Sequence, residues 1–125
     1  MSIFNLLKKI YPLNTSIAGK DNRKKLEIIA REIPLKILNF KSGKKCYDWI
    51  TPDEWQLNEA YIKSIKTQKK IVDIKNSYLH VINYSKSIKK TLNFTDLKKN
   101  LITDRYMPNS IPYATSYYQK NWGLH

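Results

Sequence analysis

The chain has 125 residues, of which 42% are hydrophobic and 26% are charged. This length allows one domain of ordinary size, and the composition is typical of a globular protein. No apolar run approaches the roughly 20 residues that a membrane helix requires, so we expect no contact with a membrane. The single cysteine, Cys46, excludes an internal disulfide and favours a reducing compartment, which predicts a cytoplasmic protein.

The formal net charge of +13 raises the question of a nucleic-acid partner, because clustered cations bind phosphates through counterion release. Only Arg23, Arg31 and Arg105 are arginines, and the lysines are spread along the whole chain. Arginine is the residue that pairs best with phosphates and guanine edges. We therefore expect a solvated, lysine-rich surface and no nucleic-acid partner, with polyanion binding as the alternative.

The first third of the sequence contains two amphipathic helical patterns. The first predicted helix covers residues 2–10, with Ser2 as its N-cap. The second covers residues 22–33, with a cap near Asp21 and an end at Pro34. Both patterns place apolar side chains on one face and lysines on the other.

After residue 34 the apolar period changes from helical to alternating, which is typical of short strands between polar turns. A third helix is predicted near residue 95, with Thr95 as its N-cap. The predicted strands cover residues 35–40, 46–50, 59–65, 70–74, 79–84 and 111–118. The sequence therefore predicts an α+β fold: two N-terminal helices, then a β-rich and mostly antiparallel portion with one further short helix.

Four blocks of the sequence carry a family resemblance: LNTSIAGKDNRKKL (13–26), IPLKILNFKSGKKCYDWITPDEWQLNEAYIK (33–63), KIVDIKNSYLHVINYS (70–85) and IPYATSYYQKNWGLH (111–125). Together they resemble the N-terminal portion of a bacterial zinc-aminopeptidase-like family that carries an inserted domain of unknown function. The resemblance implies two parts. Residues 1–40 would form the helical segment and first strand of the peptidase-like core. Residues 41–125 would form the β-rich insert, incomplete at its C-terminus.

Such a hydrolase is expected to be a larger α/β fold that holds two zinc ions with His, Asp and Glu ligands and acts on a peptide or small-molecule substrate. His80 and His125 are the only histidines of this chain. We therefore assign it no catalytic and no metal-binding residue, and expect zinc only in full-length relatives. The chain is predicted to be an inactive fragment whose β-rich part shapes or covers the substrate cleft. The alternative is a free-standing, non-catalytic binding or interaction module with a lysine-rich surface.

Aromatic and imidazole side chains are the candidates for contacting a ligand in a cleft: Trp49, Trp55, His80, Tyr113 and Tyr117. Packing is the simpler expectation for the aromatic rings, with sugar or peptide stacking on Trp55 as the alternative. A position in the core of the β-rich portion or at its rim is expected for Tyr47 and Tyr61 as well. For His80, a structural or surface role is the simpler expectation and a ligand-binding role the alternative.

Three carboxylates lie close together in sequence, Asp48, Asp53 and Glu54. They could serve in acid–base chemistry, but turn capping and hydrogen bonds to the backbone are the simpler interpretation. Cys46 is expected to be buried as a small core residue. If the chain lacks part of a larger core, an uncovered apolar face could also drive self-association.

Overall fold

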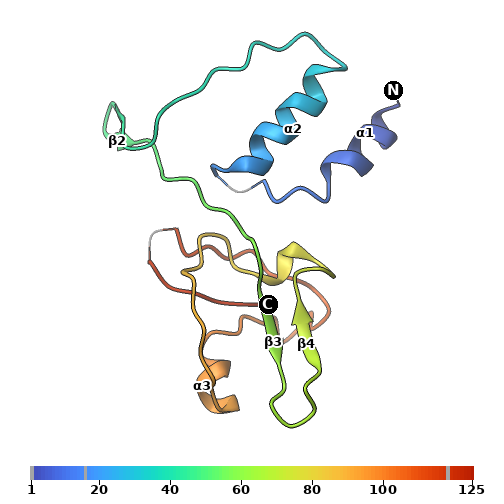
Figure 1. Cartoon of the computed structure of the whole chain (residues 1–125), viewed down its shortest axis with the longest axis vertical. Coiled ribbons are helices and arrows are strands. Elements are labelled where there is room, and N and C mark those ends of the chain that lie inside the picture. Colours follow the sequence, from blue (N-terminus) through green and yellow to red (C-terminus); the bar gives the residue numbers. More distant parts are fainter. Residues whose placement is uncertain (1, 16, 118) are drawn as a thin grey trace. The chain divides into compact units, whose positions relative to one another are not determined.

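The computed structural model describes residues 2–15, 17–117 and 119–125. In chain order the elements are α1 (Ile3–Ile10), α2 (Lys20–Ala30), β1 (Lys45–Cys46), β2 (Trp49–Ile50), β3 (Tyr61–Lys63), β4 (Lys70–Asp73), the 3₁₀ turn η1 (Tyr78–His80) and α3 (Phe94–Lys98) (Figure 1). Helices and small antiparallel sheets occur together, so the predicted α+β class is confirmed. The chain divides into two compact units, Met1–Leu57 (unit 1) and Asn58–His125 (unit 2).

The two helices of unit 1 lie side by side (Figure 1). The predicted cap of α1 is confirmed, because the Ser2 hydroxyl accepts a hydrogen bond from the backbone N–H of Asn5 at 3.3 Å. α2 begins earlier than predicted and its N-cap is Gly19. Asp21, the predicted cap, instead accepts a hydrogen bond from the backbone N–H of Asn14 at 3.0 Å. The Asp21 carboxylate therefore links α2 to the loop that connects the two helices.

β1 and β2 form an antiparallel hairpin in which Cys46 lies opposite Trp49. We predicted a single strand over residues 46–50, and this prediction is wrong because the chain reverses at Tyr47 and Asp48. Tyr47 has a φ of 55°, in the left-handed region that two-residue hairpin turns use. The two turn residues, Tyr47 and Asp48, therefore belong to neither strand.

The segment between α2 and β1 is extended (Figure 1), and its residues are exposed to solvent to different degrees. We predicted a strand over residues 35–40, and Leu35, Ile37 and Phe40 do alternate as strand residues do. Backbone hydrogen bonds from this stretch to other described residues are absent, so the structure has no strand here. The prediction fails because a strand needs a paired neighbour, and none of the described segments pairs with this one.

β3 and β4 form the antiparallel sheet of unit 2, with Ile62 opposite Val72. The strands predicted over residues 59–65 and 70–74 are therefore confirmed in kind, with shorter bounds. The connecting turn is closed by two backbone hydrogen bonds, from Ser64 N–H to the Lys69 carbonyl at 2.9 Å and from Gln68 N–H to the Ser64 carbonyl at 2.8 Å.

The core of unit 2 is built around its last five residues. On one side, the backbone N–H of Ile82 donates to the carbonyl of Gly123 at 3.1 Å. On the other side, the backbone N–H of Leu124 donates to the carbonyl of Asn100 at 2.9 Å. Residues 121–125 therefore lie between two other segments, as a middle strand does.

Few side chains are buried among the described residues. Ile82 and Leu124 are 5% and 8% exposed and belong to the core of unit 2. Gly123 packs between Ile82 and the backbone of Asn100, and a Cβ added there would overlap the Cδ1 atom of Ile82 and lie 3.2 Å from the Asn100 carbonyl oxygen. A larger residue at this position would therefore force the Ile82 side chain to move. The other buried side chains are Leu13, Val81 and Ser116.

Two more strand predictions are only partly met. Over residues 79–84 the chain forms η1 and then isolated bridges at Val81 and Asn83. The 3₁₀ turn forms because the Ser77 hydroxyl accepts a hydrogen bond from the backbone N–H of Leu79 at 3.3 Å. Over residues 111–118 the described part has a single bridge, at Thr115; residue 118 lies outside the described residues.

The third helix is present but begins two residues earlier than predicted. Asn93 is the N-cap of α3, and its side-chain oxygen accepts a hydrogen bond from the backbone N–H of Asp96 at 2.9 Å. Thr95, the predicted cap, lies inside the helix. Asparagine and threonine both cap helices, so the choice between two such neighbours depends on the incoming chain direction.

Candidate functional site

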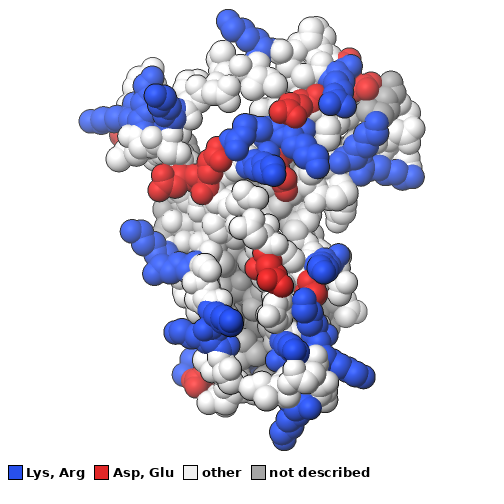
Figure 2. All heavy atoms as spheres, in the orientation of Figure 1, with Lys and Arg blue, Asp and Glu red and all other residues white. Residues whose placement is uncertain are grey.

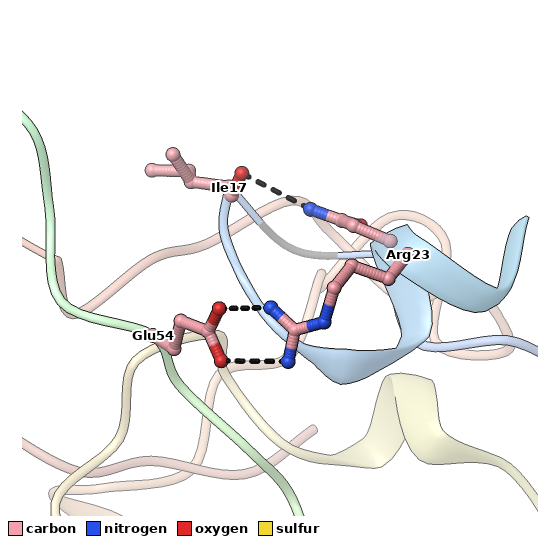
Figure 3. Close-up of polar contacts among 4 residues, drawn as sticks. Ile17, Arg23 and Glu54 are labelled. Atoms are coloured by element: carbon pink, nitrogen blue, oxygen red, sulfur yellow. Dashed lines mark hydrogen bonds and ion pairs between the residues drawn. The ribbon is translucent and has the colours of Figure 1, made fainter. Parts of the chain in front are cut away.

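Three contacts hold the segment after the hairpin against the beginning of α2. Arg23 and Glu54 form a two-point ion pair, with Nη1 donating to Oε1 and Nη2 donating to Oε2 at 3.0 Å (Figure 3). The backbone N–H of Trp55 donates to the carbonyl of Ala18 at 3.1 Å. A Cβ added to Gly19 would lie 2.7 Å from the Trp55 carbonyl oxygen, so the two backbones touch.

The residues around this contact are also ordered by a side-chain amide. The Nδ2 atom of Asn22 donates to the carbonyl of Ile17 at 3.1 Å (Figure 3). This bond ties the first turn of α2 to the loop that precedes it, next to Arg23. The loop, the helix start and the segment at Glu54 therefore form one local assembly within unit 1.

The ion pair sets the charge state of Glu54. The hydrogen bond from Arg23 lowers the pKa of the Glu54 carboxyl below its ordinary value, and the same bond raises the pKa of Arg23. Both side chains are about half exposed, at 48% and 49%. Glu54 is thus an ionised partner of a guanidinium, which does not suit a general acid at neutral pH. The simpler interpretation, a bond to the backbone, is also corrected: the partner is a side chain.

The two histidines meet in unit 2. The backbone N–H of His125 donates to the carbonyl of His80 at 2.9 Å. The Nδ1 atom of each ring is buried without a hydrogen-bond partner in the described part of the chain. Burial is the main cause that lowers the pKa of His125, and the nearby His80 lowers it further, while a hydrogen bond at Ile102 acts in the opposite direction. The neutral ring is therefore favoured at position 125.

The donor set around these histidines does not fit a zinc ion. Zinc sites in proteins use three or four His, Cys, Asp or Glu ligands. Across residues 2–15, 17–117 and 119–125, no three such side chains come close enough together to hold a metal ion. We therefore derive no chemical step through a metal for this chain.

The aromatic candidates are spread over both units. Trp49 is 51% exposed on the hairpin, and Tyr47 beside it is 93% exposed, so neither ring is buried in a core. The predicted place in the core or at its rim is wrong for Tyr47, because a hairpin of so few residues stands free of any packed layer. Tyr61, for which the same prediction was made, is 45% exposed, with the Lys70 ammonium 4.2 Å from its ring centre.

Trp55 is partly buried in unit 1, while Tyr113 is 87% exposed in unit 2. Tyr117 packs edge-to-face on Tyr84, with ring centres 4.9 Å apart and an interplanar angle of 83°. Contact between any of these rings and a ligand stays a prediction.

Cys46 is exposed and has no disulfide partner, so the expected buried position is wrong. It lies in β1 of the same free hairpin that exposes Tyr47. On the face shown in Figure 2, Lys and Arg side chains occur in several separate groups rather than in one block. None of the helices in the described part of the chain has the length and apolar character needed to span a membrane.

Residues 54–125 match the sequence family described as a domain of unknown function, DUF2172. The chain belongs to the DUF2172 family. The match begins at Glu54, the partner of Arg23, and includes all of unit 2. The division that we predicted between residues 40 and 41 concerns an insertion into a larger fold, and it stays a prediction.

The DUF2172 chain is also similar to longer proteins. It is 42% identical over 122 residues to a Clostridium acetobutylicum protein whose name proposes a polysaccharide biosynthesis protein with an aminopeptidase-like domain. It matches a crystal structure described as that of a proposed peptidase from the same species, with a TM-score of 0.92 and 42% identity. The matches cover 98% of this chain but only 28% and 29% of those proteins. The chain therefore spans less than a third of the length of these relatives.

Proposed function

We propose that this chain is the N-terminal portion of an aminopeptidase-like hydrolase and supplies none of its catalytic residues. One observation carries the proposal: nearly the whole chain corresponds, at 42% identity, to 28% of a protein with an aminopeptidase-like domain. Zinc and the general base would belong to other parts of the longer protein.

In this proposal unit 2 borders the substrate cleft of the longer protein. Its support is the exposure of aromatic side chains in unit 2, such as Tyr106 at 90% and Tyr113 at 87%. Exposed aromatic rings are well suited to contact a peptide or another small-molecule substrate. His80 and Tyr117 of unit 2, and Trp49 and Trp55 of unit 1, are the further candidates for such contacts.

We place the protein in the cytoplasm as part of the same proposal. The supporting observation is Cys46, a free thiol that is exposed on the hairpin. Exposed free thiols are stable in reducing compartments and prone to oxidation elsewhere.

The longer C. acetobutylicum protein provides the test. We expect it to release amino-terminal residues from peptides in a chelator-sensitive reaction. Removing the counterpart of residues 58–125, which form a compact unit here, should leave bound zinc unchanged but alter the ranking of kcat/KM among peptides. Zinc content measured beside kcat/KM distinguishes a changed cleft from a misfolded protein. If the ranking of kcat/KM among peptides does not change, unit 2 has no role in selecting the substrate.

A further inference from the structure

Unit 1 has almost no buried apolar side chain. Leu13, at 9% exposure, is its only buried hydrophobic residue among those described. On α1, Ile3, Phe4 and Leu7 are 78%, 65% and 52% exposed, although they form the apolar face of an amphipathic helix. A chain of this size needs a larger buried core to be stable by itself. The apolar face of α1 is therefore not covered by other described residues of unit 1.

The extended segment after α2 also has apolar side chains that are not buried. Leu38 and Phe40 are 62% and 70% exposed, and the neighbouring Leu35 and Ile37 are also exposed. Residues 34–40 make no backbone hydrogen bond to another described residue. An extended, apolar and unpaired segment is a template for pairing with the edge of a sheet.

We propose that these two features form one docking surface for the aminopeptidase-like part of the longer protein. The docking surface consists of Ile3, Phe4 and Leu7 on α1 together with the extended segment 34–40. The proposal rests on the proposed function, because the occupant is the part of the relatives that lies outside this chain. In that complex we expect residues 34–40 to become a paired β-strand and α1 to become buried.

The comparisons support this occupant. More than two thirds of the C. acetobutylicum protein lies outside the matched region. A crystal structure from the same species matches 98% of this chain with a TM-score of 0.92, and the chain covers only 29% of that structure, so most of that protein lies outside the matched region. A surface of this kind on a short piece of a longer protein is most simply covered by the rest of that protein.

Charge argues against a second copy of this chain as the occupant. Each copy carries a net charge of +13, and α1 itself carries Lys8 and Lys9 with no acidic residue in its first turn. Pairing two such surfaces would bring like charges together. A lipid surface is also a poor occupant, because the eight residues of α1 offer an apolar face only about 12 Å long.

Hydrogen exchange on three proteins tests the proposal. They are this chain, the native C. acetobutylicum protein, and a chimera in which this chain replaces the matched region of that protein. We expect the amides of residues 35–40 to exchange at least about tenfold more slowly in the chimera than in the isolated chain, because pairing protects them. The counterpart segment of the native relative should be equally protected, and this measurement does not depend on the folding of the chimera.

A pair of variants tests the face of α1. Leu7→Lys places a charge on the docking surface, and Asn5→Lys places the same charge on an exposed polar position of the same helix. In the chimera, Leu7→Lys should lower Tm and increase exchange in α1 much more than Asn5→Lys does. In the isolated chain the two variants should have similar and small effects, because Leu7 is already 52% exposed there.

Three results would overturn the proposal. The first is fast amide exchange in the counterpart of residues 35–40 in the native relative, and the second is an equal effect of the two variants in the chimera. The third is that Leu7→Lys only disrupts a dimer of the isolated chain or its binding to vesicles. The last result would assign the surface to a second copy or to phosphatidylglycerol vesicles. A different result would separate the two proposals. If the extended segment is protected in the chimera and Leu7→Lys destabilises it, but the chimera has no aminopeptidase activity, the proposed function is contradicted and the docking surface is not.

Discussion

Arg23 and Glu54 form a two-point ion pair although 31 residues of chain separate them. The pair joins the first turns of α2 to the segment that follows the hairpin, so the chain returns to its second helix before it enters unit 2. Glu54 is also the first residue of the DUF2172 match. The beginning of the matched region is therefore fixed to unit 1 by a charged side chain.

Replacing Glu54 by Gln should lower the stability of unit 1 by a small amount. The folded-state pKa of Glu54 lies below its ordinary value of 4.5, so the stability that the pair contributes is present above about pH 4.5 and is lost as the pH falls through the lowered pKa. Amide exchange in α2 at pH 7 should therefore be faster in the variant than in the wild type, and the difference should shrink in high salt.

Glu27→Gln is the matched control for this prediction. Glu27 also raises the pKa of Arg23, but only through its charge and as the smallest contribution, without a hydrogen bond. It should therefore change exchange in α2 less than Glu54→Gln does. Equal effects of the two substitutions would mean that net charge, rather than the two-point geometry, stabilises this contact.

Gly123→Ala should destabilise unit 2 by about 1–3 kcal/mol, because the added methyl group would overlap Ile82 in a packed core. The free energy of opening, obtained from amide exchange at Leu124, measures the effect. Valine lacks the Cδ1 atom that causes the overlap, so Ile82→Val should relieve part of the cost of Gly123→Ala. By itself Ile82→Val should cost about 0.5–1.5 kcal/mol. Strictly additive effects of the two substitutions would show that this clash does not determine the packing.

His125 should make unit 2 sensitive to mild acid. Its pKa in the folded chain is lower than its ordinary value of 6.5, so the folded state binds fewer protons than the unfolded state. Stability is therefore fully present above about pH 6.5 and decreases as the pH falls toward the lowered folded pKa. The free energy of unfolding of unit 2 should be lower at pH 5.5 than at pH 7.5 in the wild type. This difference should be smaller in His125→Gln. An unchanged pH dependence in His125→Gln would show that another group titrates.

Local signals explain what the sequence could predict. The cap at Ser2, the amphipathic pattern of α1, and the alternation in β3 and β4 involve neighbours within a few residues. Such patterns are visible without tertiary information. The strand predicted at residues 35–40 has the same local signal, but the structure gives it no partner, so pattern alone was insufficient.

The contacts that define the candidate sites are long-range and could not be read from the sequence. Arg23 and Glu54 lie far apart in the chain, and no local rule pairs them. The same holds for the middle position of residues 121–125, which depends on hydrogen bonds to Asn100 and Ile82, far back in the chain. The exposure of Trp49 was missed because an aromatic residue beside a strand pattern is usually packed, while this hairpin has no layer to pack on.

Zinc binding by the purified 125-residue chain is the most direct measurement. The chain is incubated with zinc, desalted, and examined by elemental analysis and by aminopeptidase assays with and without a chelator. Our account predicts no stoichiometric zinc and no release of amino-terminal residues, because the described side chains offer no set of three metal ligands. Tightly bound zinc together with chelator-sensitive hydrolysis by this chain alone would contradict it.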